Sequence, residues 1–126
     1  MFLLFSNIVL AEPIYHEKKY PEGKGPFPAI ILLHTSGGFK SNEIMNKLGS
    51  DYLKQGFAIY GPDFFKRHGI TNKTRKDTWT TYRKPIEQEL TEIVQLVKKD
   101  PKINSKNIFA IGYSNGGYWA SYLAGT

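Results

Sequence analysis

Residues 108–117 read IFAIGYSNGG, and this stretch decides the fold. Its apolar run from Ile108 to Gly112 (IFAIG) predicts a strand buried on both faces. The residues from Gly112 to Gly116 match the pattern Gly-x-Ser-x-Gly, in which a serine occupies a sharp turn between a strand and a helix. Glycine at both ends of the pattern has no Cβ, so the two backbone arms can approach each other. The stretch therefore predicts that Ser114 presents its hydroxyl at the end of a buried strand.

This turn makes Ser114 a candidate nucleophile, with Gly112 and Gly116 as the glycines of the elbow. A helix that begins just after the serine leaves the Asn115 backbone N–H pointing at the place where an oxyanion would develop. The alternative is that Ser114 only caps the helix, which is a common role of serine. The strand before the turn and the helix after it favour the nucleophile.

Strands and helices alternate along the rest of the chain. The expected strands are 29–34 (AIILLH), 57–60 (FAIY) and 108–112. The expected helices run from Ser41 or Asn42 to Gly56, from Pro85 to Lys99 and from Gly117 to Ala124. Residues 12–28 are expected to form a short strand and a loop. Glu87, Glu89 and Glu92 are expected near the positive N-terminal end of the second helix. The alternation predicts an α/β fold, with a parallel sheet between two layers of helices.

The loop after the first buried strand, His34-Thr35-Ser36-Gly37-Gly38, carries a second candidate feature. It is similar to the oxyanion loop of esterases and lipases, which donates a second backbone N–H to the oxyanion. Ser36 is the expected donor, and His34 is expected to hold the loop by hydrogen bonding. The alternative is an ordinary strand-to-helix turn.

Three stretches together resemble the dienelactone hydrolase family of the α/β hydrolases: PAIILLHTSGG at 28–38, YGPDFFKRHG at 60–69 and IFAIGYSNGGYWA at 108–120. The resemblance covers most of residues 12–126. It implies a parallel-sheet α/β-hydrolase fold, a three-layer sandwich, and cleavage of a small ester or lactone by acyl transfer without a cofactor or metal. Dienelactone hydrolases use a cysteine nucleophile where this chain has Ser114. That difference favours an esterase-type substrate over a lactone.

The residues after the elbow do not complete a catalytic triad. In this fold an acidic residue and then a histidine follow the nucleophile along the chain, but no Asp, Glu or His lies between Ser114 and Thr126. We therefore expect residues 12–126 to be the N-terminal part of an α/β-hydrolase domain, truncated after the elbow helix and inactive alone. A separately encoded C-terminal half is one possible source of the triad. His68 as a substitute base and Asp63 as the acid are weaker alternatives.

Composition excludes several other functions. The 126 residues contain no cysteine, which excludes disulfides and thiolate catalysis, and only three scattered histidines, so no metal is expected. The net charge is +6, with basic residues concentrated from Lys66 to Lys84. This segment leaves open a non-catalytic module that binds an anionic partner, but its aromatic residues match no RNA-recognition motif. Neither nucleic acid nor a membrane span is expected.

The N-terminal segment Met1 to Ala11 (MFLLFSNIVLA) is uncharged and mostly apolar. It resembles the apolar core and cleavage site of a signal peptide, although it lacks the usual basic start. A segment this short cannot span a membrane as a helix. The sequence predicts a periplasmic or secreted protein, with a buried N-terminal strand and cytoplasmic location as the alternative.

Overall fold

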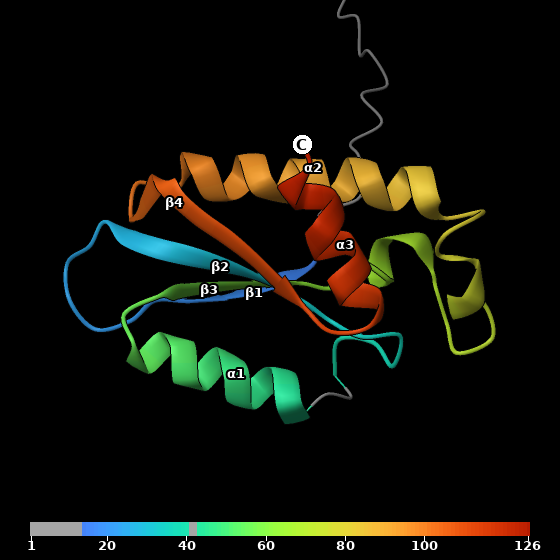
Figure 1. Ribbon diagram of the computed structural model, residues 1–126, viewed down its shortest axis with the longest axis horizontal. Helices are drawn as coiled ribbons and strands as arrows, with labels where there is room; N and C mark the ends of the chain where they lie inside the picture. Colours follow the sequence, from blue (N-terminus) through green and yellow to red (C-terminus); the bar gives the residue numbers. More distant parts are fainter. Residues whose placement is uncertain (1–13, 41–42) are drawn as a thin grey trace, which may run out of the picture.

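The computed structural model of the protein describes residues 14–40 and 43–126. The expected signal peptide (1–11) and the expected helix caps Ser41 and Asn42 lie outside the described residues. Figure 1 shows a twisted sheet with α1 (Glu43–Lys54) on one face, and α2 (Arg83–Lys99) and α3 (Asn115–Ala124) on the other. The expected three-layer α/β arrangement is confirmed.

The sheet has four strands in the order β1-β3-β2-β4. They are β1 (His16–Lys19), β2 (Phe27–Leu33), β3 (Ala58–Pro62) and β4 (Ile103–Gly112). As predicted, β2 is parallel to both β3 and β4, but β1 pairs antiparallel with β3, so the sheet is mixed. The crossover through α1 inserts β3 between β1 and β2, which leaves β1 as an antiparallel edge strand.

The predicted helices form close to their expected bounds, and two short 3₁₀ helices, η1 (Lys66–His68) and η2 (Arg75–Asp77), precede α2. Pro85 lies in the first turn of α2, where its missing N–H costs no hydrogen bond. Helix α3 begins at Asn115, earlier than expected, because the Tyr118 N–H already donates to the Ser114 carbonyl at 3.1 Å. Among the described helices, none has the length and apolarity needed to cross a membrane.

The alternation of side chains along β2 divides the core into two parts. Ala29, Ile31 and Leu33 face α2 and α3, whereas Ile30 and Leu32 face α1. The larger part includes four buried residues of α2, at the helical spacing expected from the sequence, and Trp119 of α3: Ile86, Leu90, Ile93, Val97 and Trp119. Burial on both faces explains why β2 is continuously apolar.

Strand β4 differs from its prediction in length and in burial. It begins at Ile103, which pairs with Phe27, whereas the sequence predicted a strand that starts at Ile108. The pairing is irregular between this pair and the next one, Ala29 with Ile108. The strand lies at the edge of the described sheet, and Phe109 is 51% exposed. The prediction of a strand buried on both faces is therefore wrong for β4, which has a strand neighbour on one side only within residues 14–40 and 43–126.

Candidate active site

Ser114 adopts the backbone conformation of a strained turn between β4 and α3. Its φ is 52° and its ψ is −115°, and no other non-glycine residue in the described part of the chain has a positive φ. A residue with a Cβ adopts such a conformation only when the surrounding structure enforces it. Ser114 is exposed, and its side chain makes no capping hydrogen bond to α3. The alternative of a simple helix-capping serine is therefore not observed.

The two glycines flanking Ser114 lie where a side chain would collide with backbone. A Cβ on Gly112 would lie 2.1 Å from the Gly116 carbonyl oxygen, and a Cβ on Gly116 would lie 2.1 Å from the Leu33 carbonyl oxygen. Both distances are far below any real contact. The turn consequently closes on itself through Gly112 and packs against the end of β2 through Gly116.

The loop at 34–38 lies beside this turn because β2 and β4 pair in register. Leu33 is the partner of Gly112, so the residues that follow each strand lie at the same carboxyl edge of the sheet. Within the loop, the Gly38 N–H donates to the Thr35 carbonyl at 3.0 Å, and the Gly37 N–H donates to Thr35 Oγ1 at 3.2 Å. Gly38 has a φ of +91°, which favours glycine.

Asn115 joins the turn to the loop through its side chain. Its Nδ2 donates to Ser36 Oγ at 3.1 Å and to Thr78 Oγ1 at 3.1 Å. The structure thus brings together Ser36 and Asn115, the two expected oxyanion donors. Thr78, which is fully buried, was missed from the sequence because no local pattern links it to residues far along the chain.

His34 stabilises the loop by hydrogen bonding, as expected. The His34 Nδ1–H donates to the Thr35 carbonyl at 2.8 Å, and the ring stacks on Phe64 with 3.9 Å between centroids. Burial lowers the pKa of His34, while the bond to Thr35 and the nearby charge of Asp63 oppose that shift. Because the Thr35 carbonyl accepts, the proton lies on Nδ1, and the buried Nε2, 3.7 Å from Asp63 Oδ1, has no hydrogen-bond partner among the described residues. The contacts of His34 thus lie within the loop and against Phe64.

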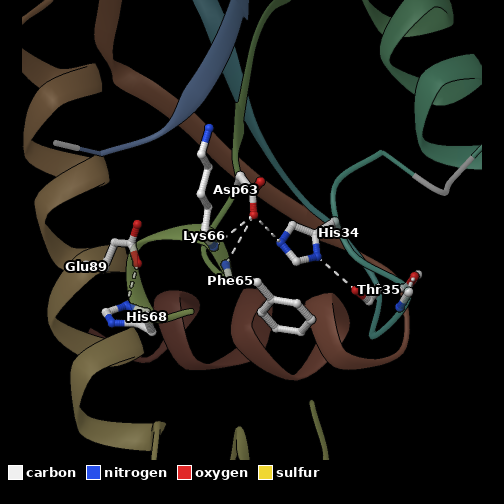
Figure 2. Close-up of polar contacts among 8 residues, drawn as sticks. His34, Thr35, Asp63, Phe65, Lys66, His68 and Glu89 are labelled. Carbon is white, nitrogen blue, oxygen red and sulfur yellow. Dashed lines mark hydrogen bonds and ion pairs between the residues drawn. The ribbon is translucent and has the colours of Figure 1, made fainter. Parts of the chain in front are cut away.

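Asp63 follows β3 and stabilises the next turn. Its Oδ1 accepts hydrogen bonds from the Phe65 N–H at 3.3 Å and the Lys66 N–H at 3.2 Å, and it lies 3.7 Å from His34 Nε2 (Figure 2). These contacts connect the start of η1 to the loop at 34–38. They all involve Oδ1 of the carboxylate that was considered as the catalytic acid.

His68 points away from this loop and toward α2. Figure 2 shows its ring facing Glu89, and the His68 Nε2 lies 2.7 Å from Glu89 Oε2. Glu89 is fully buried, which the sequence did not indicate. Arg67 adds an ion pair from η1 to α2, with Glu92 at 2.5 Å. His68 is therefore engaged in anchoring η1.

Comparison with known proteins agrees with this geometry. The sequence model of the dienelactone hydrolase family matches residues 16–126. The chain belongs to the dienelactone hydrolase family. It is 29% identical over 99 residues to Esterase EstD of Thermotoga maritima, an alignment that covers 76% of this chain and 23% of the esterase.

Two solved structures show the same fold as this family member. The 2,6-dihydroxy-pseudo-oxynicotine hydrolase has a TM-score of 0.58 and 23% identity, over 82% of this chain and 27% of that chain. A putative dienelactone hydrolase from Klebsiella pneumoniae has a TM-score of 0.57 and 10% identity, over 81% of this chain and 50% of that chain. The chain thus spans between about a quarter and a half of these relatives.

A groove of about 320 Å³ opens beside the loop of this dienelactone hydrolase family member. One wall consists of residues 36–40, which include Ser36, and the other consists of Asp63 and residues 65–66 and 70–72. The groove therefore adjoins one of the two candidate oxyanion donors at the carboxyl edge of the sheet.

The basic segment from Lys66 to Lys84 is partly neutralised by contacts within the protein. Arg83 and Lys84 both contact Glu87, at 3.0 and 3.3 Å, and Lys66 lies 4.3 Å from the Tyr15 ring centroid. Arg67 is paired with Glu92 as well. These contacts lie at the two ends of the segment, and no described ion pair involves Lys73, Arg75 or Lys76 between them.

Proposed function

We propose that this protein is a serine hydrolase that cleaves ester-type carbonyl substrates by acyl transfer, with Ser114 as the nucleophile. One observation carries the proposal: Ser114 has a φ of 52° at a turn whose flanking glycines have no room for a Cβ. Such strain is maintained at functional sites, where it presents a reactive group. Membership of the dienelactone hydrolase family and similarity to an esterase support the same reaction class.

In the proposed reaction, the Ser114 hydroxyl attacks the carbonyl carbon of the ester while a base removes its proton. The backbone N–H groups of Ser36 and Asn115 donate to the resulting oxyanion. Collapse of this intermediate expels the alcohol, which takes up the proton, and leaves an acyl group on Ser114. Water then attacks the acyl group and releases the carboxylic acid, so an ester and water give an acid and an alcohol.

The base does not come from the described histidines near the site. His34 is buried with its Nε2 3.7 Å from Asp63 Oδ1, and His68 contacts Glu89. We therefore propose that the base and its acidic partner are supplied by sequence outside these 126 residues. Without a base, serine is a weak nucleophile, so the 126 residues alone are expected to turn over a generic ester at a rate near background.

Labelling with a fluorophosphonate probe tests the nucleophile. In the protein that includes the sequence supplying the base, the probe is expected to modify Ser114 and no other serine, as located by mass spectrometry. Ser114→Ala should abolish labelling and hydrolysis of a p-nitrophenyl ester, whereas Ser121→Ala, on the exposed face of α3, should leave both unchanged. Labelling that persists in Ser114→Ala would refute the assignment.

A further inference from the structure

The side chain of Asn115 has no part in the proposed reaction, which uses only its backbone N–H. Yet this side chain is fully buried, and its Nδ2 donates to one hydroxyl on each of two separate segments. An amide nitrogen has two hydrogens, so both donors are used, one toward Ser36 and one toward Thr78.

Burial of the Asn115 side chain also has an energetic cost. Its Oδ1 is buried and has no hydrogen-bond partner among the described residues, and an unpaired buried acceptor is unfavourable. A small apolar residue would avoid that cost. It would also lose both hydrogen bonds to the neighbouring segments.

We propose that the Asn115 side chain is a positioning residue that sets the oxyanion loop against the elbow, with Thr78 as its second anchor. The contact fixes Ser36, one proposed oxyanion donor, to the residue that carries the other. Thr78, in the segment just before α2, accepts the second hydrogen bond from the same amide. This inference rests on the proposed function, since it assigns how the two donors of that site are kept at their spacing.

Four variants distinguish this positioning role from simple packing. Thr78→Val keeps the shape of the buried side chain but removes the hydroxyl, and Thr78→Ser keeps the hydroxyl. Asn115→Ala keeps the backbone N–H but removes the amide. Asn107→Ala changes an exposed asparagine of β4 and is the matched control.

The experiment measures the rate of Ser114 phosphonylation by a fluorophosphonate in the protein that includes the sequence supplying the base. Asn115→Ala and Thr78→Val are expected to lower the maximal rate by about tenfold with little change in probe affinity, because oxyanion donors act mainly in the transition state. Thr78→Ser is expected to restore most of the rate lost in Thr78→Val. Folded Asn115→Ala protein that reacts at the wild-type rate would overturn the proposal, as would equal rates for Thr78→Ser and Thr78→Val.

A second measurement keeps this proposal distinct from the proposed function. Amide hydrogen exchange at Gly38, whose N–H is bonded to Thr35, reports opening of the loop without any reaction. Exchange should become about tenfold faster in Asn115→Ala and Thr78→Val but not in Asn107→Ala. If no form of the protein reacts with the probe, the proposed function is refuted. If exchange at Gly38 is the same in Asn115→Ala as in the wild type, the positioning role is refuted, whatever the result with the probe.

Discussion

Gly116 is the residue through which the strained turn is held against the sheet. Its Cα approaches the end of β2 so closely that a Cβ would lie 2.1 Å from the Leu33 carbonyl oxygen and 2.6 Å from the His34 carbonyl oxygen. Backbone atoms cannot move aside as a flexible side chain can. The contact therefore requires glycine at this position, independently of any catalytic role.

Gly116→Ala is expected to lower the free energy of unfolding by about 3 kcal/mol or more, since the added methyl group must displace β2 or the turn. Urea denaturation followed by circular dichroism measures this change. Gly49→Ala is the control, because its Cβ would lie 3.4 Å from the end of the Leu32 side chain and alanine favours a helix. A loss below about 1 kcal/mol for Gly116→Ala would contradict the close packing.

The buried His34 predicts a pH dependence of stability. Its pKa in the folded protein is lowered by burial from 6.5, so the unfolded chain takes up a proton at a pH where the folded protein does not. The free energy of unfolding should therefore fall as the pH decreases below about 6.5, by at most about 1.4 kcal/mol per pH unit. Denaturation between pH 7 and pH 5 should show a steeper fall for the wild type than for His34→Gln. Equal slopes would mean that His34 titrates normally.

Sequence patterns identified the residues of the turn but not those that hold it. Gly112, Ser114 and Gly116 belong to one short pattern whose backbone demands are known. Thr78 contacts Asn115 across 37 positions of sequence, and a threonine between η2 and α2 carries no signal of that contact. Pairings of this kind follow from the packed fold and cannot be read from local spacing.

At the scale of elements, a hydrogen bond and an ion pair attach η1 to α2. His68 contacts the fully buried Glu89, and Arg67 contacts the more exposed Glu92. The segment between β3 and α2 contains only short 3₁₀ turns, so these contacts supply order that regular hydrogen bonding does not. One wall of the groove beside Ser36 depends on this segment.

His68→Leu should destabilise the protein by about 3 kcal/mol, because it leaves the Glu89 carboxylate buried without its partner. The double variant His68→Leu/Glu89→Leu should recover much of that loss, because two buried leucine side chains need no hydrogen-bond or charge partner. Arg83→Ala breaks an exposed ion pair and should leave the stability nearly unchanged, because water screens the two charges. The free energy of unfolding is measured for the two single variants, His68→Leu and Glu89→Leu, and for the double variant. If the changes in the single variants add up to the change in the double variant, His68 and Glu89 are not directly coupled.

Element prediction succeeded where periodicity was strong and failed where context decided. The spacing of apolar residues in α2 located the helix, and the apolar run in β2 located the central strand. The burial of Glu89 in the same helix was not anticipated, because only the contact with His68 explains a buried carboxylate there. The early start of β4 depends on its pairing with β2, which local sequence does not encode.

At the scale of the molecule, β4 leaves one side of the described sheet open. The strand pairs with β2 alone among the described strands and carries an exposed phenylalanine, Phe109. An open, apolar edge of this kind can pair with another chain. The same edge adjoins a cavity of about 460 Å³ lined by residues of β4, α2 and α3.

The 126 residues are therefore expected to self-associate as their concentration rises. Sedimentation velocity should show larger species for the wild type than for Phe109→Lys, because a charge at the edge opposes strand pairing. Leu96→Lys, which alters an exposed leucine of α2, is the control and should behave like the wild type. A monomer at all concentrations would show that the edge is already protected.

The contact between Asn115 and Ser36 has a consequence for the order of events during protein synthesis. The two residues are 79 positions apart, so at 5–20 residues per second the loop leaves the ribosome roughly 4 to 16 s before its partner is made. Phe64 follows His34 much sooner in the chain, and its ring stacks on the His34 ring. The stacked histidine can thus keep the nascent loop folded while the rest of the site is still being translated.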